Sequence, residues 1–253
     1  SFDTFSHQIG HGMDRLQATQ PRLWSLPQGG TAAGTGLNAP PGFDRLFCAE
    51  LSALTGIAFR PNPCKFEGMG AHDALVEVSG ALNVVAGSLA KIANDIRLMG
   101  SGPRCGLSEL QVPDDGLSSS IMPGKRNPTV AEVLVQAAYQ AMGHHLTVTL
   151  ASSAGHFELN VAKPVLIHHL LRAMRALADS TRVFSERLVQ GLEAHTDQLA
   201  QQVAHSLLQA TVLNPVLGYD TVARITRHAM EQDISPRQAA VALGVLTEAE
   251  YDH

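Results

Sequence analysis

Apolar residues recur at helical spacing along most of this chain. The clearest stretch alternates steps of three and four positions and ends before Gly100 and Gly102-Pro103, which are expected to stop a helix. At about 1.5 Å per residue it spans about 36 Å. The pattern predicts one long helix with a continuous apolar face, made of Leu75, Val78, Leu82, Val85, Leu89, Ile92, Ile96 and Met99.

Two further stretches predict long helices of the same kind. One shows nearly the same spacing and stops at Gly191; its members are Ile167, Leu170, Met174, Leu177, Thr181, Phe184 and Leu188. The other lies between these two helices and is rich in alanine: Leu134, Ala137, Ala138, Ala141, Met142 and Val148. No hairpin signal or alternating strand pattern is found. The chain is therefore predicted to be all-α, with its long helices packed as a bundle.

The alanine and valine residues around these helices suggest packing on more than one face. Such helices are typical of bundles that are buried between subunits. A monomeric bundle is the alternative.

The C-terminal part has a different character. From about residue 206 the long apolar faces stop, and residues 213–215 and 217–220 are interpreted as turns. Short helices are predicted near 220–230 and 235–243, the second with Ser235 as N-cap before Pro236. We therefore expect a bundle domain over residues 1–205 and a small helical domain over residues 206–253.

Composition excludes several classes of protein. The 253 residues are 45% hydrophobic, which is enough for a large core, and the net charge of −5 without a basic run does not suggest nucleic-acid binding. The three cysteines form no CxxC pair and no disulfide framework, as in a reducing compartment. No signal peptide and no run of about 18 apolar residues is apparent, so no membrane partner is expected.

The segment Ser118–Pro128 carries the strongest candidate chemistry. Asn127 is expected to be an N-cap and Pro128 the first residue of the alanine-rich helix. Free backbone N–H groups at the start of a helix, together with Lys125, would form an anion site beside the serine hydroxyl groups. The alternative is a polar loop that only caps the helix.

The same segment resembles the signature loop of the fumarase/aspartase superfamily, Gly-Ser-x-x-Met-x-x-Lys-x-Asn. The matching residues are Ser119, Met122, Lys125 and Asn127, whereas Ser118 replaces the glycine. Further segments resemble class II fumarases in the family's order: 29–38, 65–67, 101–106, 157–161 and 218–220. Cys105 and Gly124 differ from the alanines usual in aspartases, and Arg126 resembles the loop of adenylosuccinate lyases.

The resemblance implies a fold and an activity. The fold is a central five-helix bundle shared in a homotetramer, with residues 115–128 as a catalytic loop. The activity is the reversible hydration of fumarate to L-malate, in the cytoplasm or the mitochondrial matrix, without a cofactor or metal. The resemblance covers only the C-terminal half to three-fifths of the family pattern. The N-terminal domain and the Thr-His segment with the family's catalytic histidine have no counterpart here.

The resemblance also implies roles for single residues. Ser119 matches the serine that removes a proton from carbon, and Glu132 matches the carboxylate that partners the absent histidine. The base could also be Ser118 or Ser120, because three serines follow one another. The substrate-binding group is Ser120, Lys125, Arg126 and Asn127, with Arg126 acting mainly through its backbone.

Other interpretations remain open. His7 and His11 have the spacing of two metal ligands on a helix, but a packed or solvated pair is favoured. Residues 29–36 are interpreted as a tight connection between helices. Two alternative functions are another superfamily lyase that yields fumarate (aspartase, or an argininosuccinate or adenylosuccinate lyase) and a non-catalytic helical bundle that only oligomerises.

Overall fold

The computed structural model describes residues 2–114, 116, 121–122, 125 and 127–251. Their contacts separate into two compact units. The first consists of Ser1–Leu98 and Val112–Gly191, and the second of Met99–Gln111 and Leu192–His253.

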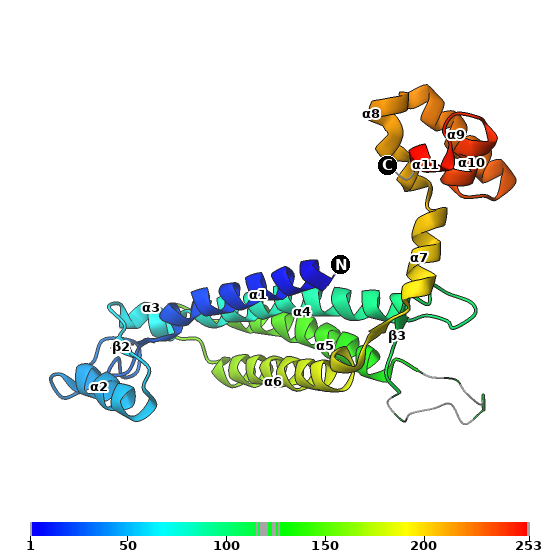
Figure 1. The fold of residues 1–253 in the computed structure, drawn as a ribbon. Coiled ribbons are helices and arrows are strands. Elements are labelled where there is room, and N and C mark those ends of the chain that lie inside the picture. Colours follow the sequence, from blue (N-terminus) through cyan, green and yellow to red (C-terminus); the bar gives the residue numbers. More distant parts are fainter. Residues whose placement is uncertain (1, 115, 117–120, 123–124, 126, 252–253) are drawn as a thin grey trace. The chain divides into compact units, whose positions relative to one another are not determined.

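Four long helices form the first unit: α1 (Phe2–Leu23), α4 (Asp73–Met99), α5 (Thr129–Ser152) and α6 (Lys163–Arg187). Taken in the order α1, α4, α5, α6, successive helices run antiparallel to one another (Figure 1). The last three are the long helices predicted from apolar spacing, and their existence is confirmed. The resemblance implies five bundle helices; the described residues supply these four, and the 13-residue α2 (Phe43–Thr55) lies at one end of the bundle.

Helix α1 packs closely along α4. A Cβ atom on Gly12 would lie 3.1 Å from Val85 Cγ2, so the glycine allows the two helices to approach. The amide of Gln8 donates to the hydroxyl of Ser88 at 3.1 Å, and Arg22 pairs with Glu77 near the other end of α1. These contacts fix the antiparallel register of the two helices.

The predicted apolar face of α4 is largely buried, as shown by Val78, Leu82, Leu89, Ile92 and Ile96. The predicted face of α6 is partly wrong. Ile167 is 44% exposed. The buried row keeps the predicted Leu170, Leu177 and Phe184, but Leu166, Ala173 and Ser180 take the places expected for Ile167, Met174 and Thr181. Helix α6 carries two neighbouring apolar rows, and one copy of the chain buries only one of them.

By length and composition, α4 is long and apolar enough to cross a membrane, the single such helix in the described part of the chain. Its most apolar window has a mean hydropathy of 1.4, and 39% of that window is buried inside the unit. Packing against α1 and α5 buries part of this apolar surface, and the core helix of a bundle has the same composition.

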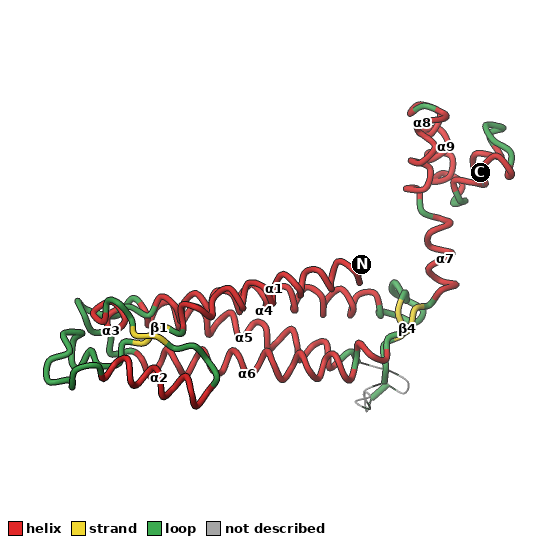
Figure 2. Tube along the Cα trace, turned by 60° about the vertical axis from the view of Figure 1, so that its left-hand side comes forward, coloured by secondary structure: helices red, strands yellow, loops and turns green. Residues whose placement is uncertain are grey.

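Short elements close one end of the bundle (Figure 2). Strand β1 (Ser25–Leu26) pairs in parallel with β2 (Arg60–Pro61), and α3 (Lys65–Gly70) follows. A 3₁₀ turn, Val189–Gly191, ends the unit after α6.

The second unit is a small helical assembly with one antiparallel pair of strands, β3 (Leu110–Gln111) and β4 (Glu193–Ala194). Its helices are α7 (Thr196–His205), a 3₁₀ helix (Leu207–Leu213), α8 (Asn214–Leu217), α9 (Tyr219–Gln232), α10 (Pro236–Ala242) and α11 (Glu248–Tyr251). Ile225, Ala229, Ala239 and Ala240 form its buried core. The predicted boundary at residue 206 falls after α7, and the domain assignment stays a prediction.

The sequence prediction for this unit is confirmed at α10 and corrected before α9. Ser235 accepts a hydrogen bond from the backbone N–H of Gln238, whose side chain accepts one from the backbone of Ser235, as a capping box requires. The segment 213–215, predicted as a turn, is helical instead: Pro215 stands in the first turn of α8, where its missing N–H costs nothing. Gly218, with a φ of 76°, separates α8 from α9.

Candidate functional site

The predicted catalytic loop leads directly into α5. The backbone N–H of Glu132 donates to the carbonyl of Pro128 at 3.1 Å, so Pro128, with a ψ of 54°, is the N-cap and the helix begins at Thr129. The prediction of Asn127 as N-cap is therefore wrong by one position. Pro128 accepts the first helical hydrogen bond, and among the described residues no side chain caps this helix.

The structure describes only part of the candidate site. Lys125 is exposed, and its backbone N–H donates to the carbonyl of Met122 at 3.2 Å. Asn127 is partly buried just before the cap. The positions of Ser119, Ser120 and Arg126 lie outside the described residues, as does that of Ser118. The described structure therefore brings a cation, an amide and a carboxylate to the start of one helix.

Glu132 lies in the first turn of α5, facing the last turn of α4. Its Oε1 lies 3.4 Å from Nη2 of Arg97, and the two side chains are 38% and 42% exposed. A carboxylate near a helix N-terminus and a guanidinium near a helix C-terminus are both stabilised by the helix dipoles. The pair holds a half-exposed carboxylate at the base of the loop, where it can orient a histidine or accept a proton. Sequence analysis did not identify Arg97, because its partner is 35 residues away on another helix.

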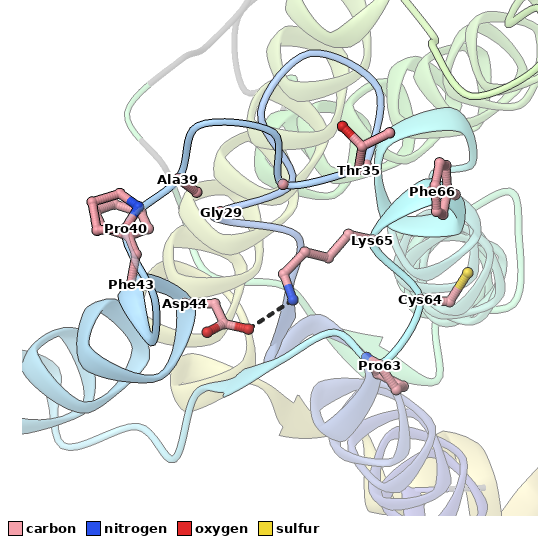
Figure 3. Close-up of a pocket in the computed structure, with 12 residues that line it drawn as sticks. Gly29, Thr35, Ala39, Pro40, Phe43, Asp44, Pro63, Cys64, Lys65 and Phe66 are labelled. Atoms are coloured by element: carbon pink, nitrogen blue, oxygen red, sulfur yellow. Dashed lines mark hydrogen bonds and ion pairs between the residues drawn. The ribbon is translucent and has the colours of Figure 1, made fainter.

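A cavity of about 370 Å³ lies at the opposite end of the first unit. Figure 3 shows Lys65 crossing it, with its Nζ atom 2.7 Å from Oδ2 of Asp44. The walls of the cavity come from the glycine-rich connection, the start of α2 and the start of α3. The other lining residues are Gly29, Gly34, Thr35, Gly36, Ala39, Pro40, Phe43, Pro63, Cys64 and Phe66. Sequence analysis missed this ion pair as well.

The charges in this cavity compensate each other. The hydrogen bond from Lys65 is the largest cause that lowers the pKa of Asp44 below its ordinary value, and a backbone N–H from Arg45 acts in the same direction. The carboxylate therefore stays ionised beside the ammonium group, which leaves no bare cation for an anionic ligand.

The glycine-rich segment is the tight connection that the sequence predicted, between β1 and α2. At Gly34 the φ is 98°, and a Cβ atom would lie 2.6 Å from the backbone N of Phe66. Only glycine fits this approach to α3. The segment shapes the cavity through its backbone.

The cavity and Glu132 are far apart within one copy of the chain. Glu132 contacts Arg97 near the C-terminal end of α4, whereas the cavity adjoins α3, just before α4 begins at Asp73. These two ends of α4 are separated by about 36 Å at about 1.5 Å per residue. The chain therefore carries two separate candidate sites.

The structure offers little support for a metal site. Across the described residues, no group of three His, Cys, Asp or Glu side chains could hold a metal ion. Of the histidines singled out in the sequence, His7 is exposed and its Nδ1 lies 2.9 Å from the carbonyl of Asp3 on the same helix. All three cysteines are unpaired.

Comparison with known protein families gives two matches. A family described as "Lyase" matches residues 1–143, and one described as "Fumarase C C-terminus" matches residues 210–253. Together they include α1 to α4, the predicted catalytic loop with the beginning of α5, and most of the second unit.

Curated relatives match the chain over nearly its full length. The mitochondrial fumarate hydratase of Dictyostelium discoideum is 48% identical over 99% of this chain and 52% of its own length. The class II fumarate hydratase of Caulobacter vibrioides is 47% identical over 99% of this chain and 54% of its own length. The human mitochondrial fumarate hydratase is 47% identical over 99% of this chain and 49% of its own length. The chain thus spans about half the length of the curated relatives it matches.

Solved structures give the same picture. The class II fumarase of Schistosoma mansoni superposes with a TM-score of 0.95 and 37% identity, over 99% of this chain and 55% of that one. A Brucella melitensis protein described as fumarate lyase:delta crystallin bound to cobalt superposes with a TM-score of 0.93 and 35% identity, over 99% of this chain and 54% of that one.

Proposed function

Because this chain belongs to the lyase family, among its class II fumarases, we propose that it supplies part of a fumarate hydratase. The reaction is the reversible anti addition of water to fumarate, giving L-malate. The observation that carries the proposal is the start of α5, where the signature loop with Lys125 and Asn127 leads into a first turn that presents Glu132.

The chemistry requires stabilised negative charge. When a proton leaves the carbon next to a carboxylate of malate, the intermediate carries two negative charges at that end of the substrate. Lys125 supplies a fixed cation, Asn127 an amide donor, and the first backbone N–H groups of α5 a favourable dipole. Arg126 contributes mainly through its backbone N–H. Such donors stabilise the intermediate more than the substrate, which is what lowers the barrier.

Ser119 is the proposed base at carbon, and Ser120 the proposed contact to a substrate carboxylate. A serine hydroxyl becomes a base only when its oxyanion is stabilised, here by loop N–H groups and Lys125. Glu132 is the proposed partner of a histidine that handles the proton of the leaving water. That histidine belongs to the N-terminal part of the family pattern, which these 253 residues do not cover.

The assembly we infer is a homotetramer with shared active sites. Large apolar side chains remain more than half exposed on the bundle helices, as with Tyr139, Leu146 and Leu150 in a row on α5 and Leu171 on α6. Solvent contact of such a row is unfavourable by about 25 cal/mol per Å² of apolar surface. Copies of the same chain would cover these faces. The relatives include mitochondrial and bacterial enzymes, so the location we infer is the cytoplasm or the mitochondrial matrix.

The test measures loss of the ultraviolet absorbance of fumarate, with the product identified chromatographically. Two samples are compared: the chain alone, and the chain fused behind the N-terminal half of the Caulobacter vibrioides relative. Malate formed by the fusion without added ammonia supports the proposal. The N-terminal half alone is the matched control.

Other outcomes separate the alternatives. Aspartate formed only with ammonia would move the assignment to an aspartase, which Cys105 and Gly124 argue against. A fusion that folds and assembles without turning over fumarate would favour a helical bundle that only oligomerises.

A further inference from the structure

Two histidines meet across the interface of α5 and α6. Nδ1 of His144 lies 2.7 Å from Nδ1 of His169, and the ring centroids are 4.9 Å apart at an interplanar angle of 60°. Both side chains are partly buried. The distance is that of a hydrogen bond between the two imidazole rings.

A hydrogen bond between two imidazole nitrogens limits how many protons the pair can hold. One Nδ1 must carry a hydrogen atom and the other must offer a lone pair. The bond forms when both rings are neutral or when one is charged. When both rings are charged, each Nδ1 is a donor, the acceptor is lost and the two cations repel each other.

The surroundings of His144 disfavour its charged form. Burial is the largest cause that lowers the pKa of His144, followed by the charges of His169, Arg172 and His168, all on α6. His168 itself lies edge-on to His169, with 5.2 Å between ring centroids. No carboxylate is among the groups that shift this pKa.

A third histidine, His145, lies next to His144 on α5 and is turned towards α4. Its Nδ1 lies 3.0 Å from the hydroxyl of Ser79, and its Cε1 would lie 3.8 Å from a Cβ atom on Gly80. Neither of these α4 residues carries a charge, and the charged groups that shift the pKa of His144 all lie on α6 and are positive when protonated.

We propose that the His144–His169 contact is a proton-sensitive clasp between α5 and α6, closed near neutral pH and opened by acid. The sign follows from linkage. A histidine whose charged form is disfavoured in the folded protein stabilises the fold above its unfolded pKa, about 6.5, and loses that contribution as the pH falls below it. The clasp does not depend on the proposed catalytic function.

The experiment is a double-mutant cycle with His144→Asn, His169→Asn and the double variant, followed by thermal unfolding near pH 7.5 and near pH 5.0 with EDTA present. His7→Asn, an exposed histidine on α1, is the matched control. Near pH 7.5 we expect a coupling of about 2–4 °C between the two sites, the effect of one hydrogen bond in a protein of this size. Near pH 5.0 we expect the coupling to vanish. Equal coupling at both pH values, or none near pH 7.5, would overturn the proposal.

A second measurement does not depend on how well the variants fold. Long-range ¹H–¹⁵N NMR spectra of the wild-type chain report the protonation of each imidazole nitrogen. The clasp predicts, near neutral pH, a protonated Nδ1 on one ring and an unprotonated Nδ1 on the other. It also predicts that His144 becomes charged at lower pH than an ordinary histidine. A His144 ring that becomes charged in the ordinary histidine range would contradict it.

Discussion

Arg97 and Glu132 join the end of α4 to the beginning of α5, with 3.4 Å between Nη2 and Oε1. The loop that carries Lys125 runs between these two helices. The ion pair therefore fixes the side chain at the base of the loop to the body of the bundle. A partly exposed pair of this kind contributes little to stability, so its value would lie in orienting Glu132.

Replacing Arg97 should separate its effect on stability from its effect on the orientation of Glu132. The variant is made in the fusion with the N-terminal half of the Caulobacter vibrioides relative. There Arg97→Gln should lower kcat by roughly tenfold, because a misplaced group at an active site slows the reaction. It should change the free energy of unfolding by less than about 1 kcal/mol. Kinetics and thermal unfolding of the same sample test this. Arg182→Gln removes exposed ion pairs on α6 and is the control. Equal loss of kcat in both variants would mean that Arg97 does not orient Glu132.

The glycine-rich connection gives a prediction about stability. Gly34→Ala should destabilise the chain by about 2 kcal/mol or more, because it places a Cβ atom against the backbone of Phe66 at a left-handed φ. Gly10→Ala is the matched comparison, in the middle of α1 with nothing within 4 Å of the added atom. It should stabilise the helix by up to about 1 kcal/mol. Chemical denaturation of both variants measures the difference, and a neutral Gly34→Ala would refute the close approach.

The Lys65–Asp44 pair predicts a dependence on acid pH. The pKa of Asp44 is lowered in the folded chain, so its contribution to stability is present above the unfolded value of about 4 and lost as the pH falls through the folded one. Lys65→Met should therefore lower the midpoint of thermal unfolding near pH 7. The variant and the wild-type chain should converge near pH 2.5.

The control for this prediction is Asp44→Asn, which removes the same titration and should also converge with the wild-type chain in acid. If the cost of Lys65→Met were the same near pH 7 and near pH 2.5, the side chain would stabilise the fold by packing rather than by charge.

The sequence predicted the long helices because their apolar spacing reflects burial of one face. Helix α4 shows this best, with a regular series from Val78 to Ile96 and a stop at Gly100. The buried row of α6 was predicted correctly at Leu170, Leu177 and Phe184 but not at its start, since Leu166 and Ile167 are both apolar and only the packing of one copy selects Leu166. The N-cap at Ser235 was predicted correctly because the signal, a serine followed by Pro236, is local in the sequence.

The sequence predicts residues of the candidate site only where they stand close together along the chain. The loop ending at Asn127 and the carboxylate of Glu132 follow from a contiguous motif. The helix began one residue later than predicted, because Pro128 rather than Asn127 accepts the first helical bond. Arg97, the Lys65–Asp44 pair and the His144–His169 pair depend on which helices meet, and no spacing along the chain encodes that.

The most direct test of the account compares Ser119→Ala with Ser118→Ala in the active fusion. Loss of a base at carbon should lower kcat for malate dehydration by about 10²- to 10⁴-fold, the usual contribution of general acid–base catalysis. Ser118→Ala, one position away on the same loop, should retain most of the activity. Near-normal turnover by Ser119→Ala, with the large loss in its neighbour or in neither variant, would contradict Ser119 as the base.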